Sequence, residues 1–199
     1  MNSKELHFDS DGRKKLLSGI KQIAKAVKST LGPRGNTVLI ESQEHTGGIT
    51  VTKDGVTVAK SINLLDSVEN LAVRIMKEAA DKTATSAGDG TTTAIVLTEA
   101  LVTNAVEYFE DNIANRTEVL KLLQSECDTI IKKLKKDSKK ISGKKLKDVA
   151  VISANNDEEI GELIYKVYSE VGKDGIVTVE KSKNHETYYE TTKGMKIDR

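Results

Sequence analysis

Apolar side chains recur every three or four residues along most of the chain, and this spacing predicts helices. Over residues 11–31 they follow the i, i+3, i+4, i+7 pattern of an amphipathic helix, which Ser10 or Asp9 is placed to cap. The same pattern predicts four further helices, from residue 67 to the sequence SAGDG, over 90–109, from a Thr117 cap to 136, and over 157–172. The helix over 90–109 is expected to be buried through Ala94, Ile95, Leu97, Leu101, Val102 and Val106.

β-Branched residues gather in runs that predict strands. Residues 36–42 and 49–62 flank a glycine-containing turn, as expected for a β-hairpin, and Asp54-Gly55 marks a second tight turn. Two later stretches are also strand-like, residues 175–181 and 186–194. The sequence therefore predicts a mainly α protein with a β-hairpin, followed by a small α/β unit.

A lysine-rich stretch that also contains serine and glycine, residues 135–148, is the best candidate for a domain boundary. A solvated helix end and a functional basic patch would both explain its lysines, and we favour the solvated end. The stretch separates the helical part of the chain from the α/β unit that follows.

Composition and charge narrow the classes of protein. The 199 residues are 37% hydrophobic and 31% charged, and their net charge of +1 provides no field to attract nucleic acid or a membrane. Aromatic residues make up 4%, which disfavours base stacking. The single Cys127 excludes an intrachain disulfide and a cysteine zinc cluster. Neither a membrane-spanning run nor a signal-peptide core is seen, so a cytoplasmic location is expected.

The sequence GDGTTT, residues 88–93, places a carboxylate, a flexible backbone and three hydroxyls at the start of a predicted helix. The first amides of a helix have no internal partner and lie at the positive end of its dipole, so they attract anions such as phosphate. Asp89 would repel phosphate unless a divalent cation lay between them, as Mg²⁺ does when it binds a carboxylate and phosphate oxygens. An ordinary helix cap is the alternative, but three adjacent threonines disfavour a helix and indicate a further role.

Two other glycine-containing loops have a similar character. The sequence STLGPRG, residues 29–35, contains the only proline, Pro33, and TKDG, residues 52–55, offers Lys53 to a phosphate and Asp54 as a second carboxylate. Taken separately, the first is a helix C-terminal turn and the second an ordinary hairpin turn. The patterns GxxxxGK[ST] and GxGxxG are absent, which excludes an ordinary P-loop protein.

Six motifs follow one another along the chain: TLGPRG, TKDGVTVAKSI, AGDGTTTAIVL, VISANNDEEIGELI, VGKDGIVTVE and GMKIDR. In this order and spacing they closely resemble the motifs of group I chaperonins of the bacterial GroEL type. The resemblance runs from about Phe8 to Arg199, and GDGTTT is its most specific part.

The resemblance implies a ring-forming ATPase that helps other proteins to fold. It assigns residues 1–135 to a multihelical equatorial domain that binds ATP and makes ring contacts, 136–192 to an intermediate domain and 193–199 to the start of an apical domain, with Gly194 at the hinge. The implied partners are unfolded polypeptides, a lid-like co-chaperonin and further copies of the chain in the ring, without nucleic acid or membrane. The implied cofactors are ATP and Mg²⁺, with K⁺ as an additional candidate.

The resemblance also assigns roles to residues of the three loops. Asp89 would ligate Mg²⁺ and Lys53 would contact a phosphate, while Asp54 matches a catalytic acidic residue near the γ-phosphate. The remaining nucleotide-binding residues would be Thr30, Leu31, Gly32, Pro33, Gly90, Thr91, Thr92 and Thr93.

The chain departs from the family pattern in several ways. Family members are more than twice as long, and segments that return after the apical domain complete the nucleotide pocket and supply a catalytic aspartate. The usual Gly-Met-Asn-Pro-like turn is replaced by NIANRT at 112–117, and the usual hinge proline is missing from KDSKKIS at 136–142. These differences affect the hinge and one helix start, and they leave the phosphate loops intact.

Three functions are therefore weighed. The first is an ATP-dependent folding chaperone, of which this chain is an N-terminal fragment that is inactive by itself. The second is a non-enzymatic, truncated or degenerate subunit that only docks into rings. A reading frame that continues past residue 199 would favour the first function over the second. An unrelated phosphotransferase is disfavoured because the histidines, His7, His45 and His185, fall in separate polar contexts.

Overall fold

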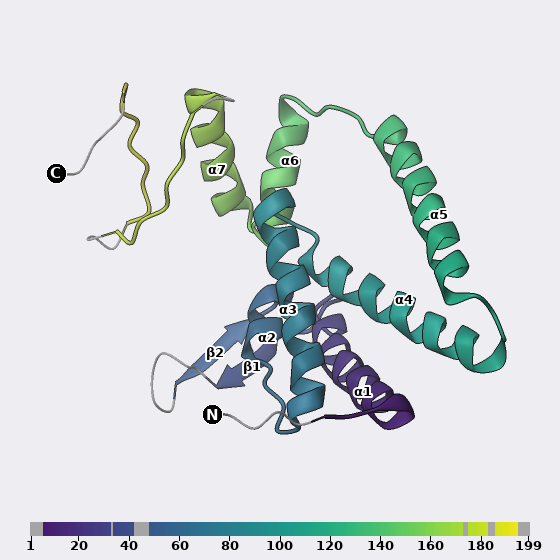
Figure 1. Ribbon diagram of the computed structural model, residues 1–199. Helices are drawn as coiled ribbons and strands as arrows, with labels where there is room; N and C mark the ends of the chain where they lie inside the picture. Colours follow the sequence, from purple (N-terminus) through teal and green to yellow (C-terminus); the bar gives the residue numbers. More distant parts are fainter. Residues whose placement is uncertain (1–5, 33, 42–47, 173–174, 183–185, 195–199) are drawn as a thin grey trace. The chain divides into compact units, whose positions relative to one another are not determined.

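The computed structural model describes residues 6–32, 34–41, 48–172, 175–182 and 186–194 (Figure 1). These residues form α1 Asp9–Lys28, β1 Val38–Glu41, β2 Ile49–Thr52, α2 Gly55–Ser61, α3 Ser67–Ala87, α4 Thr91–Asp111, α5 Arg116–Asp137, α6 Lys144–Ser153 and α7 Glu158–Val171. The prediction of a mainly helical protein with one hairpin is confirmed. The chain divides into two compact units, Met1–Lys121 and Leu122–Arg199, so that α5 crosses from one to the other. The domain boundary expected after residue 135 stays a prediction.

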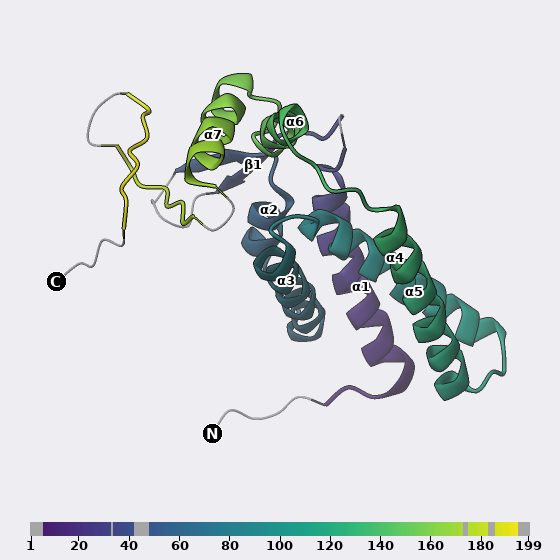
Figure 2. The same cartoon turned by 90° about the horizontal axis from the view of Figure 1, so that it is seen from above.

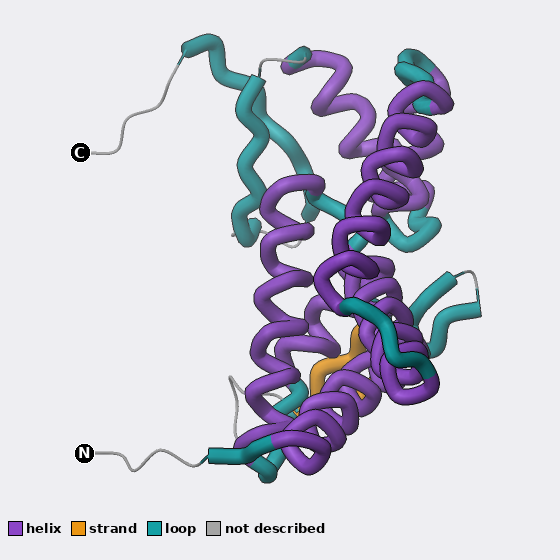
Figure 3. Tube along the Cα trace, turned by 45° about the vertical axis from the view of Figure 1, so that its right-hand side comes forward, coloured by secondary structure: helices purple, strands orange, loops and turns teal. Residues whose placement is uncertain are grey.

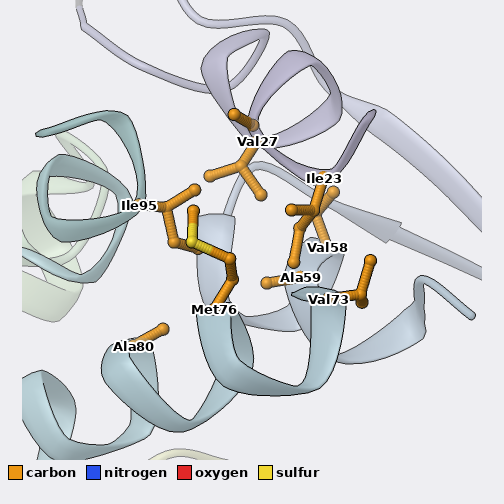
Figure 4. Close-up of a cluster of buried hydrophobic side chains, with 9 residues drawn as sticks. Ile23, Val27, Val58, Ala59, Val73, Met76, Ala80 and Ile95 are labelled. Carbon is orange, nitrogen blue, oxygen red and sulfur yellow. The ribbon is translucent and has the colours of Figure 1, made fainter. Parts of the chain in front are cut away.

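The core of the first unit lies where four helices meet. Helix α1 packs against α2, α3 and α4, and α3 also packs against α4 (Figure 2). Their buried side chains form one cluster, in which Ile95, Met76 and Val27 point toward one another (Figure 4). The cluster consists of Ile23, Ala24, Val27, Val58, Ala59, Val73, Met76, Ala80 and Ile95. Burial of these apolar groups holds the ends of α1, α2 and α4 in one place.

Helices α1 and α3 approach each other closely at Gly19. A Cβ atom at this position would overlap the backbone of Glu69, so only glycine fits. Polar contacts flank the crossing, since Lys15 Nζ lies 2.7 Å from Asp66 Oδ2 and Gln22 donates to Glu69 Oε2 at 2.8 Å. The crossing therefore combines close backbone contact with a polar edge.

The predicted hairpin is confirmed (Figure 3, orange). Strands β1 and β2 are antiparallel, with Leu39 opposite Val51. Side chains alternate along both strands, and Val38 and Ile40 pack against the helical core, whereas Leu39 and Val51 are exposed. One face of the hairpin thus extends the core of the first unit.

The second β-branched run differs from the prediction after residue 54. Residues Gly55–Ser61 form helix α2 instead of a strand after a tight turn. Asp54 caps this helix, and Val58 and Ala59 are buried in the core. The C-terminal end of α2 is fixed by Lys77 of α3, which donates to the Lys60 carbonyl at 2.9 Å. Capping and burial together outweigh the strand preference of the valines and threonine.

Three expectations about helix ends and burial were wrong. Helix α1 begins after Phe8, which occupies the cap position, so Asp9 and Ser10 lie within the first turn and not at the cap position. Asn115, rather than Thr117, caps α5, because its Oδ1 accepts the amides of Thr117 and Glu118. In α4, only Ile95 of the six expected side chains is fully buried, and Leu97 and Leu101 remain 56% and 47% exposed.

The second unit contains a helix that the sequence pattern did not predict. Helix α6 begins within the lysine-rich stretch and extends beyond it, and it packs against α7, where Gly161 is buried against Val151. Lys147 of α6 pairs with Glu162 of α7 at 2.6 Å, which raises the pKa of the lysine and lowers the pKa of the glutamate. The helix predicted over 157–172 is confirmed as α7.

Neither strand-like stretch near the C-terminus forms a strand in the described residues. Residues 175–182 and 186–194 have no ladder partner there, and a β-strand is stable only when its amides and carbonyls are paired. The Thr191 hydroxyl instead donates to Glu170 of α7 at 2.9 Å.

Candidate functional site

Helices α3 and α4 are joined by three residues with an unusual backbone. Gly88 has φ +73° and ends α3, and Gly90 has φ +85° and precedes α4. Both angles lie in the left-handed region that glycine adopts without strain. The two glycines flank Asp89, whose side chain is exposed.

The N-terminus of α4 has no side-chain cap. Gly90 occupies the cap position and offers no side-chain acceptor to the amides of the first turn. The first backbone hydrogen bond of the helix runs from the Ala94 amide to the Gly90 carbonyl. The amides of residues 91–93 therefore point outward at the positive end of the helix dipole. Asp89 does not cap them, because its Oδ1 accepts the amide of Gly90 at 2.6 Å.

The three threonines of the GDGTTT motif differ in exposure. Thr91 is buried, Thr92 is half-buried and Thr93 is exposed. Thr92 lies against Gly55 at the start of α2, where a Cβ atom would overlap the Thr92 hydroxyl and touch Val27. Gly55 thus brings the TKDG loop, the first turn of α4 and the last turn of α1 together.

Asp54 is held in place by the first turn of α2. Its carboxylate accepts the Val56 amide at 3.3 Å and both the amide and the hydroxyl of Thr57, at 2.9 and 2.7 Å. Burial raises the pKa of Asp54, but the hydrogen bonds from Thr57 and Val56 and the charge of Lys60 outweigh it and lower the pKa overall. The neighbouring Lys53 is exposed and has no ion pair within the described ranges.

The loop after α1 folds back on the end of that helix. The Thr30 hydroxyl donates to the Val27 carbonyl at 2.8 Å, and the Asn36 amide donates to the Ser29 carbonyl at 2.7 Å. Gly32 has φ +79°, and Leu31 is 47% exposed. Pro33 lies outside the described residues. Val27, whose carbonyl accepts the Thr30 hydroxyl, also lies beside Gly55, so the start of this loop is connected to the TKDG loop through Val27.

The donor set fits an anion better than a bare metal ion. Among the residues that the structure describes, no group of three His, Cys, Asp or Glu could hold a metal. A Mg²⁺ ion at Asp89 would therefore take its other ligands from phosphate oxygens and water, as Mg²⁺ commonly does. The outward amides of α4 offer donors to those phosphates.

A hollow of about 440 Å³ lies elsewhere, between α1, α2 and the hairpin. Its lining includes Ala26, Val38, Val58 and Ile62, and none of the predicted site residues. Most of its lining side chains are apolar, and its one charged side chain, Glu41, would repel an anion, so we place the candidate site at the glycine loops.

Two contributions to the site were missed in the sequence. Thr57 fixes the Asp54 carboxylate, and its spacing of three residues after an aspartate is a helix N-terminal signal that was available. Gly55 allows the contact with Thr92, which no local pattern could indicate.

Comparison with known proteins identifies the family. The model of the TCP-1/cpn60 chaperonin family matches residues 23–199. The chain therefore belongs to the TCP-1/cpn60 chaperonin family, and the chaperonin resemblance is confirmed at this level. The narrower group I assignment stays a prediction.

Solved chaperonin structures share the fold. The chaperonin gp146 from the bacteriophage EL 2 (Pseudomonas aeruginosa), crystallised in the presence of ATP-BeFx, is 31% identical, with TM-scores of 0.70 and 0.69 in two crystal forms. The match covers 81% of this chain and 28% of gp146. A group III chaperonin in the open state is 23% identical over 80% of this chain and 32% of its own, with a TM-score of 0.66. The chain thus spans about a third or less of the chaperonins that it matches.

Proposed function

We propose that the chain binds Mg-ATP at its three glycine loops, as part of a chaperonin ring subunit that encloses unfolded polypeptides. Membership of the TCP-1/cpn60 family supports the chaperone role, and the ATP-BeFx present with gp146 supports a nucleotide ligand. A lid-like co-chaperonin, ring assembly with further copies, a cytoplasmic location and K⁺ as a second cation belong to the same proposal.

One observation carries the proposal. The N-terminus of α4 is left uncapped by a left-handed glycine, although a capped helix would be more stable, and it is held against the start of α2 through Gly55 and Thr92. Two exposed carboxylates lie in these loops, Asp89 just before α4 and Asp54 just before α2. The outward amides can bind the phosphates of a nucleotide. A divalent cation can lie between those phosphates and the carboxylates, which would otherwise repel each other.

Each loop would contribute a distinct group. The amides of residues 91–93 and the Thr93 hydroxyl would donate to phosphate oxygens, and Lys53 would add a positive charge. Asp89 would hold the Mg²⁺ ion, which neutralises phosphate charge when bound. Asp54, whose carboxylate is held by Thr57, would orient groups near the γ-phosphate. Thr30, Leu31 and Gly32 would border the nucleotide from the α1 loop.

The test is calorimetric titration of the 199-residue chain with ATP, with and without Mg²⁺, together with phosphate-release measurements. We expect Mg²⁺-dependent binding without turnover, and we expect Asp89→Ala to abolish the Mg²⁺ dependence. Asp128→Ala is the matched control, because Asp128 is an exposed aspartate on α5 outside the three glycine loops. ATP affinity with Mg²⁺ that is the same in Asp89→Ala and in the unmodified chain would refute the role of Asp89.

A subunit that docks into rings without binding nucleotide is the second candidate. It is favoured by the exposed apolar side chains of the hairpin, Leu39, Ile49 and Val51. Absence of ATP binding combined with co-assembly into chaperonin rings would support it.

A further inference from the structure

The most strongly charged part of the chain lies in the second unit. Residues 132–147, which we call the basic strip, contain nine lysines and one acidic residue, Asp137, and so carry a net charge of +8. The whole chain carries +1, and the other residues therefore sum to −7. The strip runs from the last turns of α5 through an irregular link at 138–143 into the first turns of α6 (Figure 1).

Most lysines of the basic strip are unpaired. Lys147 is held by Glu162 at 2.6 Å. The other eight are exposed and form no ion pair with any residue that the structure describes: Lys132, Lys133, Lys135, Lys136, Lys139, Lys140, Lys144 and Lys145. Their charges are therefore available to an external anionic partner.

Local stability does not explain the lysines at the start of α6. Lys135 and Lys136 lie in the last turn of α5, where the helix dipole favours positive charge. Lys144 and Lys145 lie in the first turn of α6, where the dipole disfavours it, and this turn contains no acidic residue and no side-chain cap. A feature that lowers helix stability without a local benefit indicates a role in binding.

The basic strip also has a regular apolar component. Three of its lysine pairs are each followed by one aliphatic residue, Leu134, Ile141 and Leu146, which are 63%, 44% and 36% exposed. Arginine is absent between residues 116 and 199, and no aromatic residue occurs between Phe109 and Tyr165. The strip therefore combines positive point charges with small apolar contacts. It lacks aromatic residues that stack on bases and arginines that form bidentate hydrogen bonds to phosphate.

We propose that the basic strip binds acidic segments of other polypeptides in which carboxylates alternate with aliphatic side chains. The unpaired lysines would bind the carboxylates, and Leu134, Ile141 and Leu146 would contact the aliphatic side chains. A nucleic acid would use the charges but neither the aliphatic residues nor any stacking group. The proposal does not depend on nucleotide binding, so that either can fail without the other.

The test measures fluorescence anisotropy of a labelled peptide of four Glu-Glu-Leu repeats with the full 199-residue chain. The comparison ligands are a peptide of four Glu-Glu-Ser repeats and a mixed-sequence single-stranded DNA with the same number of charges. We expect the leucine peptide to bind most tightly, and its affinity to fall between about 50 mM and about 300 mM salt, because exposed charges are screened.

Two quadruple variants localise the binding. Lys139→Gln, Lys140→Gln, Lys144→Gln and Lys145→Gln together remove four charges from the basic strip without removing a helix-stabilising group. The matched control removes four exposed lysines elsewhere, by Lys14→Gln, Lys21→Gln, Lys25→Gln and Lys181→Gln. We expect about tenfold weaker peptide binding in the first variant, because exposed ion pairs are individually weak, and little change in the second. Circular dichroism checks that both variants fold like the unmodified chain.

Three outcomes would overturn the proposal. These are no binding of the leucine peptide, equal losses in the two quadruple variants, and DNA binding as tight as that of the leucine peptide. The last outcome would identify the strip as a nucleic-acid surface.

Discussion

At the scale of single residues, Asp54 connects local stability with the candidate site. Its carboxylate caps α2 through Val56 and Thr57, and these hydrogen bonds outweigh burial and lower its pKa. A carboxyl group with a lowered folded-state pKa stabilises the fold above its unfolded-state pKa, and this stabilisation is lost as the pH falls through the folded-state pKa. Acid should therefore weaken the start of α2.

Replacing Asp54 tests this coupling. We expect Asp54→Ala to lower the free energy of unfolding by about 1 kcal/mol at pH 7, because the helix loses its cap. Urea unfolding at pH 7 and at pH 3 measures the effect, and the difference from the unmodified chain should shrink at the lower pH. Asp54→Ser is the control, since serine caps helices without a charge. A pH-independent difference would contradict the role of the ionised carboxylate.

Gly90 offers a second test at the same scale. Its φ of +85° places any other L-residue in the left-handed region. We expect Gly90→Ala to lower the free energy of unfolding by about 1–2 kcal/mol, because of contact between Cβ and the backbone. Gly90→Asn should cost less, since asparagine tolerates this conformation. Thermal denaturation distinguishes the two variants, and equal melting temperatures would contradict the backbone explanation.

At the scale of elements, the approach of α1 and α3 at Gly19 fixes how the core forms. We expect Gly19→Ala to destabilise the fold by about 1–3 kcal/mol, since its Cβ would overlap the Glu69 backbone and force the helices apart. This effect opposes the gain that alanine brings to a helix. Lys21→Ala, two residues later on the exposed side of α1, is the control and should be close to neutral. A stabilised Gly19→Ala variant in urea unfolding would show that the helices separate easily.

The sequence predicted elements best where a strong periodic pattern coincided with burial. Helix α3 begins at Ser67 and the hairpin forms as expected, because their apolar residues face a core. Helix α2 was missed because Val56, Thr57 and Val58 favour strands by themselves, whereas the Asp54 cap and the burial of Val58 are contributions from tertiary structure.

The other misses have related causes. Helix α6 was hidden by the lysines of the basic strip, and its apolar contacts with α7 appear only in the folded unit. At the site, the GDGTTT motif predicted a helix start, and α4 begins there without a side-chain cap, while anion binding stays a prediction. The contact between Gly55 and Thr92 joins residues far apart in the chain, and local patterns contain no information about it.

At the scale of the whole molecule, apolar side chains remain on the surface of the first unit. Leu39 and Val51 lie opposite each other on the hairpin with 70% and 63% of their surface exposed, and Leu97 of α4 is 56% exposed. Such groups favour association with other surfaces. No helix among the described residues is long and apolar enough to cross a membrane.

We expect the 199-residue chain to self-associate. Sedimentation velocity over a range of concentrations should show a rising average mass, and the melting transition should be broad or depend on concentration. Leu39→Ser with Val51→Ser should reduce the association, while Lys14→Gln on α1 should not. A monomer with a sharp two-state melt at every concentration would contradict the prediction.

The link between α5 and α6 has a consequence for proteolysis. Residues 138–143 are irregular and exposed, and Lys139 and Lys140 lie within them. Proteases need an extended, accessible segment, and trypsin cleaves after lysine. Brief trypsin digestion should therefore cut here before it cuts the lysines of α1 or α3, and release a fragment that ends at residue 139 or 140. The same lysines that we assign to polypeptide binding would thus make this link a site of cleavage, and a bound acidic segment would protect it.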